Sequence, residues 1–189
     1  MFFEFLYWTV GRLIKWIFRL QPEGLENLPR HGVLLCPNHA SNWDPVLIGV
    51  CLPHNYHLRI MAKEALFHNK ALAWLIRKLG AFPVTRGTAD IQSVKTAMQV
   101  IKDGQNLLIF PEGTTIRNGL GYVDGLPPHA HSGIAVIGVR SGATLVPVFA
   151  DGPKKPFHKH RIIFGKPYTP VYTGRRGTSE EMQKIADDI

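Results

Sequence analysis

The amino-acid sequence predicts an α/β fold: a single domain in which helices flank a largely parallel, twisted sheet. Short apolar runs with the length of strands alternate with longer segments of helical periodicity. This alternation is typical of strand–helix–strand units, whose strands pair in parallel. The chain has 189 residues, enough for one hydrophobic core that needs neither disulfides nor a metal ion.

The first twenty residues predict an amphipathic helix that lies at a membrane interface. Large apolar side chains fall on one arc of about 160°, and Arg12, Lys15 and Arg19 lie opposite them. Trp8 and Trp16 stand among these charges, and an aromatic, cationic rim suits the headgroup layer. Packing of the helix on the rest of the chain is the alternative. A spanning helix is not expected, because no apolar run approaches about 18 residues.

Residues 21–30 contain two prolines and a glycine and are expected to form a connector, after which the domain occupies 31–189. Strands are expected at 33–36, 57–62, 81–84, 106–110 and 144–149. Helices are expected from Asp44, where Pro45 takes the first helical position, and then at 64–78, from Thr88 to Gly104, at 132–140 and after Thr178. Thr178 and Glu181 have the spacing of a capping box.

Composition limits the compartment and the partners. Cys36 and Cys51 lie in apolar surroundings and do not form the disulfide framework of a small secreted protein, so a reducing compartment is expected. The net charge of +8 favours anionic partners such as acidic lipid, nucleic acid or a phosphorylated metabolite.

The loop NHASNWDP, which follows the first expected strand of the domain, contains a candidate catalytic pair. His39 and Asp44 are five residues apart, about 140° on a helix, so only a turn brings their side chains together. In one interpretation Asp44 orients His39, whose other ring nitrogen acts as a general base. In the other, Asp44 caps the following helix and His39 is a surface residue.

Two further loops at strand ends carry groups suited to an anion. The loop TRG places Arg86 before an expected helix N-terminus, where a guanidinium pairs with a phosphate. The loop PEGTT joins Glu112 to a glycine and two hydroxyl side chains. In a parallel sheet, loops at the carboxyl ends of the strands form the ligand site.

Four stretches, NHASNWDP, GAFPVTRG, FPEGTT and LVPV, occur in the order of the four sequence blocks of the glycerolipid acyltransferases, and the chain resembles this family from about residue 25 to residue 165. The resemblance implies a glycerol-3-phosphate acyltransferase-like fold, with residues 31–189 as the acyltransferase domain. It also implies acyl transfer from a thioester to the free hydroxyl of lysophosphatidic acid (1-acylglycerol-3-phosphate), which gives phosphatidic acid without an acyl-enzyme intermediate.

By this resemblance His39 is the general base and Asp44 its orienting partner. The residues implied to bind the acceptor are Arg86, Glu112, Gly113 and Thr114. Many members have arginine where this chain has Thr115, and Arg117 could supply the missing charge, so another lyso-lipid remains an alternative acceptor. The implied donor is acyl-CoA or acyl carrier protein, with no bound cofactor or metal. The implied place is the cytoplasmic face of the cell membrane, as a peripheral or monotopic protein on an anionic bilayer.

The sequence allows three alternative interpretations. Cys36 could act as a nucleophile, although a thiol at the end of an apolar strand is usually buried and inert. Histidine pairs such as His158 and His160 have spacings that a metal could use, without an accompanying metal motif. A non-enzymatic protein that binds anionic membranes is the alternative of another class. Basic residues near the C-terminus, Lys154 among them, match no nucleic-acid motif and are expected to face lipid or donor phosphates.

Overall fold

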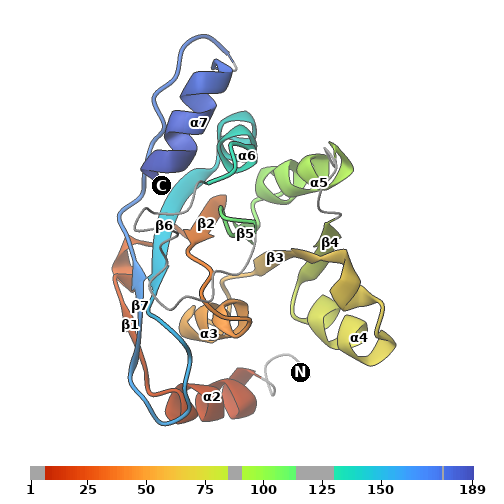
Figure 1. Cartoon of the computed structure of the whole chain (residues 1–189), viewed down its shortest axis with the longest axis vertical. Helices are drawn as coiled ribbons and strands as arrows, with labels where there is room; N and C mark the ends of the chain where they lie inside the picture. The colour runs from red at the N-terminus through yellow and green to blue at the C-terminus, as the bar shows by residue number, and fades with distance from the viewer. Residues whose placement is uncertain (1–6, 85–90, 114–129, 176) are drawn as a thin grey trace.

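The computed structural model of the chain describes residues 7–84, 91–113, 130–175 and 177–189 (Figure 1). The strands of this part form one sheet in the order β1-β7-β6-β2-β5-β3-β4. β6 and β7 run antiparallel, and every other neighbouring pair is parallel. The prediction of a single α/β domain with a largely parallel sheet is confirmed.

The strands are β1 (Leu20–Glu23), β2 (Val33–Pro37), β3 (Leu58–Lys63), β4 (Ala81–Val84), β5 (Asn106–Leu108), β6 (Thr144–Ala150) and β7 (His160–Phe164). The α-helices are α2 (Arg12–Ile17), α3 (Asp44–Cys51), α4 (Lys70–Lys78), α5 (Ile91–Lys102), α6 (Gly133–Ser141) and α7 (Ser179–Asp188). A π-helical turn, Tyr7–Gly11, precedes α2, and short 3-10 helices occupy Leu25–Asn27 and Glu64–Phe67.

Helices cover both faces of the sheet, with α5, α6 and α7 on one side and α2, α3 and α4 on the other (Figure 1). The side chains of β2 alternate between two buried clusters, because successive residues of a strand point to opposite faces. Leu34 packs with residues of α5, α6 and α7, whereas Leu35 packs with Ile48 of α3. A central strand that is buried on both faces reads as a continuous apolar run, which is why it was recognisable in the sequence.

The N-terminal helix ends earlier than predicted. Residues 1–6 lie outside the described part of the chain; from Tyr7 the helical structure continues to Ile17, and Arg19 adopts a positive φ of 41° before β1 begins. Gly11 packs against Val50 of α3, and Phe18, 5% exposed, is buried. Large apolar side chains on the outer side are nevertheless exposed: Trp8, Val10, Leu13 and Trp16. The helix therefore packs on the domain along one side and presents an aromatic surface on the other.

The predicted connector, 21–30, contains an edge strand of the sheet. β1 pairs in parallel with β7, and Leu20 lies opposite His160. Pro22 is tolerated there because an edge strand has one hydrogen-bonding side without a partner strand. The prolines in this segment suggested a linker, and the correction is that its first three residues belong to the sheet.

Two helix predictions differ in their outcome. The segment 64–78 is interrupted, because the side chain of Asn69 accepts the N–H of Leu72 at 3.1 Å and caps a new helix, α4. At the start of α7 the predicted capping box is confirmed, with Thr178 and Glu181 bonding to each other's backbone N–H groups. Thr88 lies outside the described residues. Within the described ranges, no helix is both long and apolar enough to cross a membrane.

Candidate active site

The candidate site lies where the parallel strands β2, β5 and β6 end. Asn38, directly after β2, joins two of these ends through its side-chain amide. The N–H of Ala150 donates to Asn38 Oδ1 at 2.7 Å, and Asn38 Nδ2 donates to the carbonyl of Ala150 at 3.0 Å. This pair of hydrogen bonds between neighbouring strand ends holds the start of the loop that carries the catalytic candidates.

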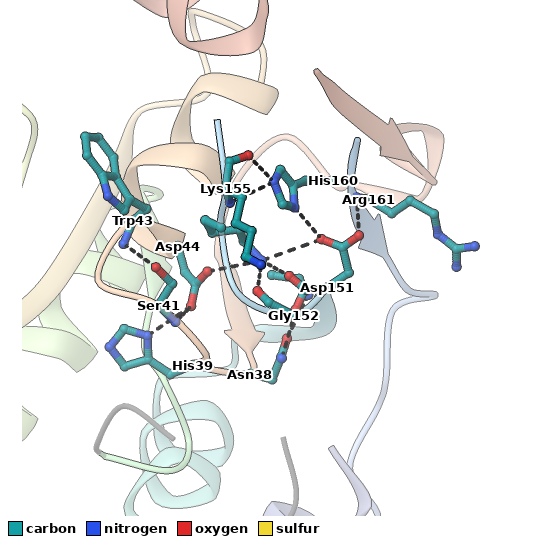
Figure 2. Close-up of polar contacts among 12 residues, drawn as sticks. Asn38, His39, Ser41, Trp43, Asp44, Asp151, Gly152, Lys155, His160 and Arg161 are labelled. Carbon is teal, nitrogen blue, oxygen red and sulfur yellow. Dashed lines mark hydrogen bonds and ion pairs between the residues drawn. The ribbon is translucent and has the colours of Figure 1, made fainter. Parts of the chain in front are cut away.

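His39 and Asp44 lie together, as the sequence predicted (Figure 2). His39 Nδ1 is 3.2 Å from Asp44 Oδ2, and both side chains are buried. The same carboxylate oxygen accepts the N–H of Ser41 at 2.6 Å, so a backbone bond in the turn fixes its orientation. The helix α3 begins at Asp44 itself, without a side-chain cap. The carboxylate therefore points to His39 and to the turn before the helix, and the capping interpretation is wrong.

The loop after β5 packs directly on His39. The ring of Phe110 stacks on the imidazole, with centroids 3.9 Å apart and an interplanar angle of 24°. Glu112 Oε2 accepts the backbone N–H of His39 at 3.2 Å. Burial raises the pKa of the Glu112 carboxyl, and the bond from His39 partly opposes this rise. Glu112 thus connects the two loops in addition to its predicted place at the acceptor site.

Gly113 occupies a position where a side chain would not fit. Its φ is +64°, and a Cβ there would lie 2.8 Å from Cδ2 of His131. The backbone N–H of His131 donates to the carbonyl of Pro111 at 2.9 Å, which fixes this close approach. The structure thus places His131 beside the predicted acceptor loop.

Three predicted site residues, Arg86, Thr114 and Arg117, lie outside the described residues. Their assignment to the acceptor phosphate stays a prediction. Of the predicted set, the structure brings together His39, Asp44, Glu112 and Gly113.

Two residues near the site were not predicted to belong to it. Asn38 precedes His39 in the quoted motif, but its role depends on a contact with Ala150, which is distant in sequence. Lys154 was expected to face lipid or donor phosphates, yet its side chain is fully buried, with Nζ 3.5 Å from Asp44 Oδ1. Long-range contacts of this kind leave no periodic signal in a single sequence.

Cys36 is unsuited to nucleophilic catalysis. The thiol is buried in β2 and donates to the carbonyl of Leu34 at 3.4 Å. Burial raises its pKa far above the ordinary value, so the reactive thiolate is strongly disfavoured.

His158 and His160 are engaged in ordinary contacts. His160 Nδ1 lies 3.3 Å from Asp151 Oδ1, and His158 Nδ1 lies 3.0 Å from the carbonyl of Pro156. In the part of the chain that the structure describes, no three histidine, cysteine or acidic side chains are grouped so that they could hold a metal ion.

Comparison with known proteins agrees with the resemblance noted from the motifs. Residues 19–151 match the family described as Acyltransferase. The 1-acyl-sn-glycerol-3-phosphate acyltransferase of Bacillus subtilis is 34% identical over 149 residues, which cover 75% of this chain and 70% of that protein. The lyso-ornithine lipid O-acyltransferase of Pseudomonas aeruginosa is 32% identical over 110 residues, 57% of this chain and 40% of that protein.

The fold is also that of a solved structure. The crystal structure of the 1-acyl-sn-glycerophosphate (LPA) acyltransferase PlsC from Thermotoga maritima superposes with a TM-score of 0.69 and 24% sequence identity. The match covers 98% of this chain and 75% of the other. The arrangement of strands and helices described above is therefore shared along almost the whole chain.

Proposed function

The chain belongs to the acyltransferase family, and we propose that it transfers an acyl group from an acyl thioester to the free hydroxyl of 1-acylglycerol-3-phosphate, giving phosphatidic acid. Membership of this family sets aside the alternative of a non-enzymatic membrane-binding protein. The observation that carries the proposal is the buried contact between His39 and Asp44 at the strand edge where ligands bind in parallel sheets.

The geometry suits direct transfer with His39 as general base. Asp44 accepts the proton of Nδ1, which leaves Nε2 as the basic nitrogen of this tautomer. Nε2 takes the proton of the acceptor hydroxyl while the hydroxyl oxygen attacks the thioester carbonyl. The new C–O bond replaces the C–S bond, and the proton passes from Nε2 to the departing thiolate. General-base assistance of this kind contributes about 10² to 10⁴ in rate.

The acceptor phosphate is assigned to the loops around His39. Arg86 and Arg117 would supply positive charge, and Glu112, Gly113 and Thr114 would line the same space. The positive φ of Gly113 shapes the turn of this loop, and its missing side chain leaves room for the ring of His131. The net charge of +8 favours a phosphorylated acceptor and the anionic donors acyl-CoA and acyl carrier protein.

A second acceptor class is supported by a specific relative. The Pseudomonas aeruginosa protein is named for a lyso-ornithine lipid rather than for 1-acylglycerol-3-phosphate. Thr115, at the position where many members carry arginine, also weakens the preference for a phosphate. We place lysophosphatidic acid first because the Bacillus subtilis protein, named for it, matches more of this chain.

The experiment is a panel of donors and acceptors incubated with the purified protein, with released thiol measured by a colorimetric reagent. We expect acyl-CoA or acyl carrier protein to be consumed only with an acceptor, and lysophosphatidic acid to give the highest kcat/KM. A higher value for a lyso-ornithine lipid would replace the proposed acceptor. Thiol release independent of any acceptor would contradict direct transfer.

We also propose that the protein binds the cytoplasmic face of the membrane through the exposed side of its N-terminal helix. Trp16 is 68% exposed and Leu13 53%, and the cationic Arg12 and Lys15 lie beside them. Leu20, which follows α2, lies opposite His160 at the start of β7, and β7 begins beside the carboxyl end of β6. α2 therefore ends near the end of the sheet that holds the site. A lipid acceptor would thus meet His39 close to the bilayer surface.

Sedimentation with vesicles of neutral and anionic phospholipid tests this placement. We expect the combined substitution of Leu13→Ser and Trp16→Ser to reduce the vesicle-bound fraction. Val171→Ser, at an apolar side chain that is 87% exposed elsewhere, is the matched control and should bind like the wild type. Equal binding of all three proteins would refute the assignment.

A further inference from the structure

The side chain of Lys154 is fully buried behind the catalytic candidates. It lies in the loop between β6 and β7, where Nζ is 3.5 Å from Asp44 Oδ1 and 3.6 Å from Asp151 Oδ1. Nζ also donates to the backbone carbonyls of Asp151 and, at 2.9 Å, Gly152. A buried ammonium is costly unless it is paired and hydrogen-bonded, and this one is both.

The two oxygens of Asp44 have different surroundings. Oδ2 faces His39 Nδ1 and the N–H of Ser41, whereas Oδ1 is buried without a hydrogen bond among the described residues. The ammonium of Lys154 is the charge that Oδ1 faces. A buried carboxylate is costly unless it is paired, and Lys154 supplies the opposite charge on the side of Asp44 that faces away from His39.

We propose that Lys154 is a positioning residue for acyl transfer: its ammonium pairs with the Asp44 carboxylate at Oδ1 and keeps Oδ2 directed at His39. Lys154 acts through Asp44 and does not contact the substrate. This inference rests on the proposed function of His39 as the general base.

The loop that carries Lys154 is itself anchored to the sheet (Figure 2). Asp151 Oδ2 accepts the N–H of Arg161 at 2.9 Å, and Asp151 Oδ1 lies 3.3 Å from His160 Nδ1. His160 Nε2 in turn lies 2.9 Å from the carbonyl of Lys155. Asp151 thus fixes the loop and supplies a second negative charge beside the buried ammonium, and Asn38 binds the preceding residue, Ala150.

The test compares kcat and KM of the full-length protein with those of Lys154→Met, which keeps the length of the side chain and removes its charge. We expect kcat to fall by about tenfold or more, within the contribution of general-base catalysis, and KM for the acceptor to stay within about twofold. Lys155→Met is the matched control, because Lys155 is exposed, and should retain the wild-type kcat.

A second variant separates charge from loop anchoring. Lys154→Gln removes the charge but keeps N–H donors for the loop carbonyls, so it should lose kcat as Lys154→Met does. Thermal unfolding of each variant identifies loss of the fold, and Lys154→Gln replaces Lys154→Met if the latter does not fold. Wild-type kcat in Lys154→Gln would overturn the proposal.

The double variant Asp44→Asn with Lys154→Met gives the decisive readout. If Lys154 acts through Asp44, the double variant should have a kcat within about threefold of Asp44→Asn alone, since coupled residues are not additive. Losses that multiply would refute the proposal. Absence of acceptor-dependent thiol release in the wild type would instead refute the proposed function, so the two failures are distinguishable.

Discussion

Replacing Asn38 with alanine tests how the strand ends hold the site. The change removes both hydrogen bonds between Asn38 and the backbone of Ala150, which is fully buried. The N–H and the carbonyl of Ala150 are then left without these partners. An unsatisfied buried polar group costs about 1–3 kcal/mol, so the free energy of unfolding should fall by about 2–6 kcal/mol. At about 2–4 °C per kcal/mol for a chain of this size, Tm should fall by at least about 4 °C.

The activity should fall further than the lost stability explains. His39 follows Asn38 directly, and a misplacement of about 1 Å in a catalytic group can cost about 10²-fold in rate. We therefore expect kcat to fall by about 10- to 100-fold at a temperature well below both melting transitions. Differential scanning calorimetry gives Tm, and acceptor-dependent thiol release gives kcat.

Asn69→Ala is the matched control for this substitution. Asn69 caps the N-terminus of α4 away from the site, so its loss should cost about 1 kcal/mol of stability and leave kcat unchanged. If Asn38→Ala had the Tm and kcat of the wild type, the reasoning from strand ends to His39 would be refuted. If both variants lost kcat equally, the effect would be one of general stability.

Three further predictions concern residues at or near these strand ends. Gly113→Ala should lower both Tm and kcat/KM more than the control Gly104→Ala. Both glycines have a positive φ, but only at Gly113 would the added Cβ meet His131. Equal losses in the two variants would contradict the close approach of His131. Cys36→Ala should retain the wild-type kcat, and loss of activity in this folded variant would restore the nucleophile hypothesis. Burial raises the pKa of Glu112 above its ordinary value of 4.5, so the folded state holds this proton more tightly than the unfolded state. The free energy of unfolding therefore falls as pH rises from about 4.5 to the raised pKa. The Tm of Glu112→Gln relative to wild type should therefore rise with pH above about 4.5, and a constant difference would contradict the pKa direction.

The central sheet and the core of the site were predictable because their signals are local. The buried strand β2 is a continuous apolar run, and the motif NHASNWDP follows it directly. His39 and Asp44 are close in sequence, so a single turn with one backbone bond from Ser41 is enough to bring them together.

The remaining parts depend on contacts between distant segments. β1 is an edge strand that contains a proline, and its pairing with β7 joins residues far apart in the chain. Lys154 reads as one more surface cation in the sequence, and only the fold shows that it is buried against Asp44. The N-terminal periodicity was visible, but the helix ends at Ile17, and the next residue, Phe18, is buried beside Trp43 and His160.

The measurement that tests the central claim most directly is acceptor-dependent thiol release by wild type, His39→Ala and Asp44→Asn at matched protein concentration. His39→Ala should reduce kcat by about 10² to 10⁴, the contribution of a general base. Asp44→Asn should cause a smaller loss, because it removes the partner of the base and leaves the imidazole in place. Wild-type rates in both variants would contradict catalysis by this pair.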